Sequence, residues 1–217
     1  EERFLVPIAR GEHITSLALS EAGTGSHLYL TETRLERQGD HYLVNGQKQF
    51  ITNGGYADSY VATTMGAQGE AAPGEFNVLV VERGTPGITW LEAWQGFGMR
   101  GNSARALLLE DARVPAGNLL GAEGDQVWYM FEVVVPYFIM AMAGVYLGIA
   151  QAALDHTIVH VRTRRFSHSG EPLAAAPLVQ SRIAGMWADV EKGRRLVYHA
   201  AQLGDQGELS ALAAILS

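Results

Sequence analysis

The distribution of hydrophobic and polar residues divides the chain into two parts. Before Gly121, short apolar runs alternate with turn residues about every 8–12 positions, which is typical of an antiparallel β-sandwich or barrel. After Gly121, apolar residues recur at the spacing of three to four that is typical of helices. The sequence therefore predicts an α+β protein, with a β-domain at residues 1–121 and an up-and-down helical bundle at residues 122–217.

The predicted strands of the first part are short. Asn45-Gly46 is a strong signal for a two-residue turn, so the runs on either side of it are expected to form a hairpin. Residues 1–14 show no clear period and are treated as a lead-in segment. The strands are expected at residues 16–19, 31–37, 41–44, 47–52, 59–64, 76–82 and 105–110.

Four helical stretches are predicted in the second part. Pro136 suits the first turn of a helix, because the N–H that proline lacks has no partner there. Gly170-Glu171-Pro172 interrupts the helical pattern. The stretches are expected at residues 125–135, 136 to about 165, 178–203 and 209–217.

Composition excludes several classes of protein. The net charge of −7 over 217 residues argues against a nucleic-acid partner. The chain has no cysteine, which excludes disulfides and cysteine-based metal sites or nucleophiles. Absence of cysteine also fits a reducing compartment, so we expect a cytoplasmic protein.

The apolar run at residues 133–150 is the one stretch that invites a membrane interpretation. It carries no charge, and Gly144 and Gly148 have the spacing of a membrane-helix contact. However, Pro136 lies inside the run, Glu132 borders it, and no basic cluster flanks it. We therefore expect a core helix of a larger soluble assembly and no membrane partner.

Two glycine-rich segments carry the strongest candidate chemistry. Residues 17–26 and residues 45–54 are each a short apolar run that ends in a glycine-rich turn. The small residues at 23–26 let backbone N–H groups approach an anion closely. The alternative is an ordinary turn between strands.

Taken together, the two segments closely resemble the paired flavin-binding segments of the acyl-CoA dehydrogenase family. The family forms are T-E-P-G-A-G-S-D and N-G-x-K-x-(W/F)-I-T-N-G. Residues 20–27 read S-E-A-G-T-G-S-H, with Ala22 for the usual proline and His27 for the usual aspartate. Residues 45–54 read N-G-Q-K-Q-F-I-T-N-G, with Phe50 at the aromatic position.

The resemblance extends over about residues 15–217. Residues 112–121 resemble the family's D-V-R-V-P-x-x-N-L-L-G hinge, and residues 148–154 match its G-I-A-Q-A-A-L. The family's order of a β-domain followed by a helical domain is also the order predicted here.

The resemblance implies FAD as cofactor and assigns residues to it. Phe50 would stack on the isoalloxazine ring, while Ser20 and Thr52 would donate hydrogen bonds to its polar edge. Gly25 and Ser26 would lie by the pyrophosphate, and Ser26 would also lie near the CoA end of the substrate. The implied residues in this part are Leu17, Leu19, Ser20, Gly25, Ser26, Phe50, Ile51 and Thr52.

The family's R-x-x-F-G element holds the partner subunit's cofactor and corresponds to residues 163–167. Phe166 matches, whereas Thr163 replaces the arginine and Ser167 the glycine. Arg164, or alternatively Arg162, could replace the missing cation; a solvated basic helix end is the other interpretation. Gln180 resembles the glutamine that follows this element.

Departures from the family pattern bear on the reaction. Pro136 and Ile139 stand where the family has substrate-proximal Asp and Arg, so apolar surface replaces a polar contact region for acyl-CoA. The catalytic glutamate lies in a later Y-E-G-T-like segment, and the sequence ends at Ser217 before it, so no catalytic residue is assigned. His156 and His160 are four apart, but no third metal ligand has suitable spacing, and no metal is expected.

The resemblance therefore implies an enzyme of fatty acid metabolism that performs α,β-dehydrogenation of an acyl-CoA, present here as a fragment. An electron-transfer flavoprotein would be the acceptor, and the protein would be a homodimer or homotetramer. Two alternatives stay open: a flavin-dependent monooxygenase on the same scaffold, and a catalytically inactive scaffold subunit.

Overall fold

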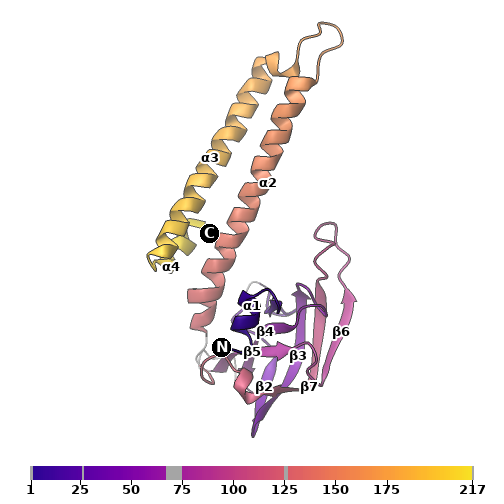
Figure 1. Ribbon diagram of the computed structural model, residues 1–217, viewed down its shortest axis with the longest axis vertical. Helices are drawn as coiled ribbons and strands as arrows, with labels where there is room; N and C mark the ends of the chain where they lie inside the picture. Colours follow the sequence, from indigo (N-terminus) through magenta and orange to yellow (C-terminus); the bar gives the residue numbers. More distant parts are fainter. Residues whose placement is uncertain (1, 26, 67–74, 125–126, 217) are drawn as a thin grey trace. The chain divides into compact units, whose positions relative to one another are not determined.

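The computed structural model describes residues 2–25, 27–66, 75–124 and 127–216. The chain divides into two compact units, Glu1–Met130 and Phe131–Ser217, where the sequence predicted a boundary at Gly121. The first unit contains the strands and the second contains the long helices (Figure 1).

The first unit is built on one seven-stranded sheet. The strand order is β1-β4-β2-β3-β7-β6, and β5 pairs with β4 beside this path. A short helix, α1 (Leu5–Ala9), precedes the sheet, and a 3₁₀ turn, Ala116–Asn118, follows it. The strands are β1 (Thr15–Ala18), β2 (Arg34–Gln38), β3 (His41–Ile51), β4 (Ser59–Gly66), β5 (Phe76–Glu82), β6 (Ile88–Ala93) and β7 (Arg105–Pro115).

The sheet is mixed, where the sequence predicted antiparallel pairing throughout. The pairs β2–β3, β3–β7, β4–β5 and β6–β7 are antiparallel, whereas β1 and β2 both run parallel to β4. Parallel pairing needs a long connection, and the segments between these strands are long enough to supply one. The α+β class is confirmed with this correction to the sheet.

The hairpin expected at Asn45-Gly46 is wrong. β3 runs without interruption through both residues, and the two-residue turn of the β2–β3 hairpin is at Gly39-Asp40 instead. Asn45 stabilises a β-bulge in β7. Its side-chain amide donates to Asp111 Oδ1 at 3.0 Å, and its Oδ1 accepts a hydrogen bond from the Asp111 N–H at 2.8 Å. Gly46 is required because a Cβ there would lie 2.7 Å from the Cα of Thr33 on the loop before β2.

A second bulge interrupts β3 itself, and it contains Phe50. Lys48 pairs with Leu107 and Ile51 pairs with Arg105, so β3 has one more residue than β7 in this interval. Phe50 has the left-handed φ of 55° that such an extra residue can adopt. The bulge therefore breaks the regular alternation of the strand in the middle of the predicted flavin segment at residues 45–54.

The core of this unit lies against one face of the sheet. Fourteen apolar residues form a single buried cluster, and Trp90 and Ile88 of the unpredicted strand β6 pack against it. The cluster consists of Ala18, Leu35, Tyr42, Val44, Ile51, Ala57, Tyr60, Ala62, Leu79, Val81, Leu107, Leu109, Ala112 and Val114.

The second unit is an up-and-down arrangement of helices. A π-helical turn, Met130–Val134, leads into α2 (Val135–Thr163), and a 3₁₀ turn, Leu173–Ala175, precedes α3 (Pro177–Asp205) and α4 (Leu209–Leu216). α2 packs on both α3 and α4, and Figure 1 shows α2 and α3 running side by side in opposite directions. Pro136 and Pro177 lie in the first turns of their helices, as predicted for Pro136.

α2 is long and apolar enough, by length and composition alone, to cross a membrane. Most of its apolar side chains are exposed in the single chain, including Phe138, Tyr146 and Ile149. A core helix of a soluble assembly passes the same test, so the sequence-based expectation of an assembly stays a prediction.

Candidate flavin site

The structure brings the two predicted flavin segments together. The Gln49 N–H donates to the Ser20 carbonyl at 2.7 Å, although β1 pairs with β4 and not with β3. This hydrogen bond joins Ser20, in the segment at residues 17–26, to the residue directly before Phe50 in the segment at residues 45–54. The site thus forms where the chain leaves β1 and where β3 bulges.

Phe50 is presented outward by its bulge. Its side chain is 57% exposed, and its ring lies 6.1 Å from that of Trp94 at an interplanar angle of 82°. An edge-on neighbour leaves one aromatic face free for a planar ligand. The predicted stacking role of Phe50 is therefore sterically open.

The other predicted ring contacts divide into two groups. Leu17 and Thr52 are exposed and Ser20 is partly exposed, so their side chains are accessible to a ligand. Leu19 and Ile51 are buried, and Ile51 belongs to the core cluster. These two residues offer a ligand chiefly their backbone groups.

In the described part of the glycine-rich turn, a glycine adopts a left-handed conformation and one hydroxyl has no hydrogen-bond partner. Gly25 is exposed and has a φ of 52°, a conformation that favours glycine. The Thr24 hydroxyl is buried and has no hydrogen-bond partner among the described residues. Ser26, which the sequence assigned to both cofactor and substrate, lies outside the described residues.

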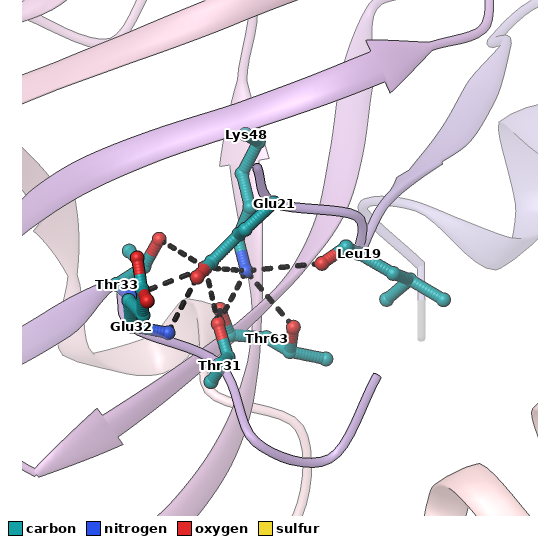
Figure 2. A network of polar contacts seen from close by, with 7 residues as sticks. All are labelled: Leu19, Glu21, Thr31, Glu32, Thr33, Lys48 and Thr63. Carbon is teal, nitrogen blue, oxygen red and sulfur yellow. Dashed lines mark hydrogen bonds and ion pairs between the residues drawn. The ribbon is translucent and has the colours of Figure 1, made fainter. Parts of the chain in front are cut away.

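Glu21, which precedes this turn in the sequence, forms a buried ion pair with Lys48 of β3. Lys48 Nζ is 2.6 Å from Glu21 Oε1, and both side chains are almost completely buried (Figure 2). Burial raises the pKa of Glu21, but the Lys48 charge and the hydrogen bonds from Lys48, Thr31 and Thr33 outweigh it and lower this pKa to about 2. Burial lowers the pKa of Lys48 to about 8 against the opposing charge of Glu21, so both groups are ionised at neutral pH.

In the helical unit, Arg164, Phe166 and Gln180 lie around the turn between α2 and α3. The Leu173 N–H donates to the Arg164 carbonyl at 2.9 Å, and the Gln180 amide donates to the Ala174 carbonyl at 2.8 Å. The Arg164 guanidinium is exposed and forms no ion pair or hydrogen bond within the described part of the chain. A planar cation in this state can bind a phosphate through paired N–H donors.

The described residues contain no group of three potential metal ligands. His156 and His160 of α2 therefore have no third ligand beside them in this part of the chain. At the start of α2, Pro136 is buried and Ile139 is partly buried. These side chains supply no charge at the positions of the family's Asp and Arg.

Comparison with known proteins decides the family. The model of the acyl-CoA dehydrogenase middle domain matches residues 16–112, and the model of the acyl-CoA dehydrogenase C-terminal domain matches residues 139–216. The chain belongs to the acyl-CoA dehydrogenase family. Members of this family are FAD-dependent flavoprotein oxidoreductases.

Individual relatives agree with this assignment. The chain is 35% identical to the mitochondrial isovaleryl-CoA dehydrogenase of Pongo abelii, over 97% of the chain and 49% of the relative. It is 38% identical to the cyclohex-1-ene-1-carbonyl-CoA dehydrogenase of Geobacter metallireducens, over 98% and 55%. The crystal structure of an acyl-CoA dehydrogenase from Geobacillus kaustophilus superimposes with a TM-score of 0.90 at 32% identity, over 97% of the chain and 56% of that structure. The chain thus spans about half the length of the relatives it matches.

The residues present fit a flavin. An exposed aromatic face at Phe50, hydroxyl donors at Ser20 and Thr52, and an apolar side chain at Leu17 are the groups that a flavin ring requires. The Thr24 hydroxyl, which has no partner in the described part of the chain, and the glycine turn suit the pyrophosphate. In an acyl-CoA dehydrogenase these groups would bind the FAD.

Sequence reasoning did not find the Glu21–Lys48 pair. A signal was available, because alternate residues of a strand point to the same face of the sheet. On β3 these are Tyr42, Val44, Gly46 and Lys48, and the first two are apolar. This alternation predicts that Lys48 points into the core, where a lysine needs a carboxylate partner.

Proposed function

We propose that the protein carrying this chain is an FAD-dependent oxidoreductase that introduces an α,β double bond into an acyl-CoA thioester. The observation that supports this most strongly is the joining of the two flavin segments, with Phe50 held outward beside Ser20. Two of the relatives named above, those from Pongo abelii and Geobacter metallireducens, are dehydrogenases of acyl-CoA substrates with a branched and a cyclic acyl group.

This chain's own residues would bind and orient the flavin. Phe50 would cover one ring face and exclude water from it, while Ser20 and Thr52 would donate to the ring's polar edge. When bound, FAD would supply the acceptor for the hydride that leaves the β-carbon, while a base would take the proton from the α-carbon. We assign no residue of this chain as that base.

The remaining features of the proposal concern partners and location. An electron-transfer flavoprotein would reoxidise the reduced enzyme. The exposed apolar surface of α2 supports assembly into a homodimer or homotetramer, since a patch of that kind is usually covered. We retain a cytoplasmic location, without a membrane, as part of the proposal.

The visible absorption spectrum of the purified protein is the first test. Bands near about 370 and 450 nm that pass a filter as FAD after denaturation are expected of a flavoprotein. Reduction of those bands by an added acyl-CoA would then establish thioester dehydrogenation. A colourless protein that takes up no added FAD would contradict the proposal and favour the inactive scaffold.

A flavin-dependent monooxygenase is the second candidate, and the apolar Pro136 and Ile139 favour it. Such an enzyme uses reduced flavin and oxygen, and it requires neither a CoA-binding cation nor a base for the α-proton. Substrate-stimulated oxygen consumption by the reduced holoenzyme, without bleaching by acyl-CoA, would select this candidate.

A further inference from the structure

The Glu21–Lys48 ion pair links the two flavin segments through the protein interior. Glu21 directly follows Ser20 in the first segment, and Lys48 lies two residues before Phe50 in the second. The side chains of Glu21 and Lys48 are 2% and 0% exposed. Neither group can therefore touch a ligand, and any effect on the site must act through the backbone.

Hydrogen bonds satisfy both charges (Figure 2). Lys48 Nζ also donates to the Thr31 hydroxyl at 2.7 Å and to the Thr63 hydroxyl at 3.0 Å, with a longer contact of 3.4 Å to the Leu19 carbonyl. Glu21 accepts from the Thr31 and Thr33 hydroxyls and from the N–H groups of Glu32 and Thr33. The network thus joins β3, β4 and both ends of the loop between β1 and β2.

Stability alone is a weak explanation for such a pair. Taking two charges out of water costs about as much as their attraction returns, and apolar residues of similar volume often serve as well. A geometric role is better supported. β1 ends at Ala18 and β2 begins at Arg34, so no strand ladder holds the glycine turn in the described part of this loop.

We infer that the Glu21–Lys48 pair, bridged by Thr31, is a positioning element for FAD binding. It holds Ser20 and the glycine turn against β3, so that they can contact the same flavin as Phe50 and Thr52. This inference rests on the proposed function, since it concerns the same flavin site. It adds residues that never contact the cofactor.

The first test removes both charges together. Glu21→Gln with Lys48→Met keeps side-chain volume and leaves no unpaired charge, so the sheet should still fold. We expect the FAD dissociation constant, measured by quenching of flavin fluorescence, to rise about tenfold, as for the loss of one charge-assisted hydrogen bond. Hydrogen exchange of residues 17–25 and 48–52 should become faster without added FAD, and the visible circular dichroism of bound flavin should change.

A milder variant with a matched control covers the case in which the double variant does not fold. Thr31→Val removes the hydroxyl that bridges Glu21 and Lys48 and keeps both charges. Thr64→Val makes the same change at an equally buried threonine, whose hydroxyl has no partner among the described residues. Thr31→Val should weaken FAD binding and speed exchange in the two segments, whereas Thr64→Val should do neither.

The outcomes separate this inference from the proposed function. If the unaltered protein binds FAD and the folded Thr31 and double variants bind it equally well, the positioning role is overturned and the proposed function stands. If the unaltered protein binds no FAD, the proposed function fails, and the flavin role of the pair fails with it. In that case faster exchange in the variants would show only that the pair orders the loop.

Discussion

The β unit and the helical unit treat their apolar residues differently. In the β unit, fourteen apolar residues form one buried cluster, and even a lysine and a glutamate are enclosed. In the helical unit, α2 is apolar enough by composition to cross a membrane, yet Phe138, Tyr146 and Ile149 are exposed in the single chain. Hydrophobic content along a sequence therefore does not tell which residues a chain buries by itself.

The largest expected difference between the units is the cost of removing a leucine. Leu107 of β7 is 0% exposed, so Leu107→Ala should destabilise the protein by about 2–5 kcal/mol through lost burial and a cavity. Leu178 of α3 is 67% exposed, so Leu178→Ala should change stability by no more than about 0.5 kcal/mol. Urea unfolding followed by circular dichroism measures both. Equal losses would mean that the helical unit is packed as tightly as the β unit.

Acid should distinguish the units next, because the buried carboxylate belongs to the β unit. The pKa of Glu21 is about 2 when folded, below its ordinary value of 4.5, so the unfolded chain binds a proton first as the pH falls. The stability that Glu21 contributes is present above pH 4.5 and is lost from there towards pH 2, at up to about 1.4 kcal/mol per pH unit. Unfolding free energies measured between pH 6 and pH 2.5 would show whether Glu21→Gln/Lys48→Met loses this slope. An unchanged slope would assign it to other carboxylates.

Phe50 offers a smaller effect that is confined to the site. Phe50→Ala should weaken FAD binding about tenfold, since stacking on an exposed ring contributes on the order of 1 kcal/mol beyond burial. Phe50→Trp keeps an aromatic face and should retain affinity. Fluorescence titration with FAD compares the three proteins, and equal affinity of Phe50→Ala would remove Phe50 from the site.

The smallest effect on the chain itself is expected at the exposed face of α2. Ile149 is 60% exposed, so Ile149→Ser should change unfolding of the separated chain by less than about 0.5 kcal/mol. If α2 is covered in an oligomer, the same change should weaken self-association. Sedimentation velocity over a range of concentrations would detect this, and an unaltered sedimentation coefficient would place the interface elsewhere.

The elements with a clear local period were predictable from the sequence. β5 was predicted at its observed bounds, and α2, α3 and α4 within two residues. The short strand β6 was missed, because its apolar Trp90 and Leu91 are adjacent and break the apolar–polar alternation by which a strand is recognised. The parallel pairing of β1 and β2 with β4 depends on contacts far apart in the chain, which no local pattern contains.

The candidate site was predictable in its segments but not in its geometry. The family resemblance identified residues 17–26 and 45–54, but the Asn45-Gly46 signal suggested a turn in place of a continuous strand. Asn45 stabilises a bulge by bonding Asp111, a residue of another strand, and short-range turn preferences cannot anticipate such a partner. The roles of the individual cofactor residues stay predictions.

The bulge at Phe50 has a consequence for how such a site can arise or disappear. Lys48 faces inward, Gln49 is partly exposed, Phe50 faces outward and Ile51 is again buried. Without Phe50, the strand would alternate regularly from Lys48 through Gln49 to Ile51, and the core would keep the same residues. The aromatic platform is therefore one residue added to a sheet that does not need it. A lineage could gain or lose this platform by inserting or deleting a single codon, with the hydrophobic core unchanged.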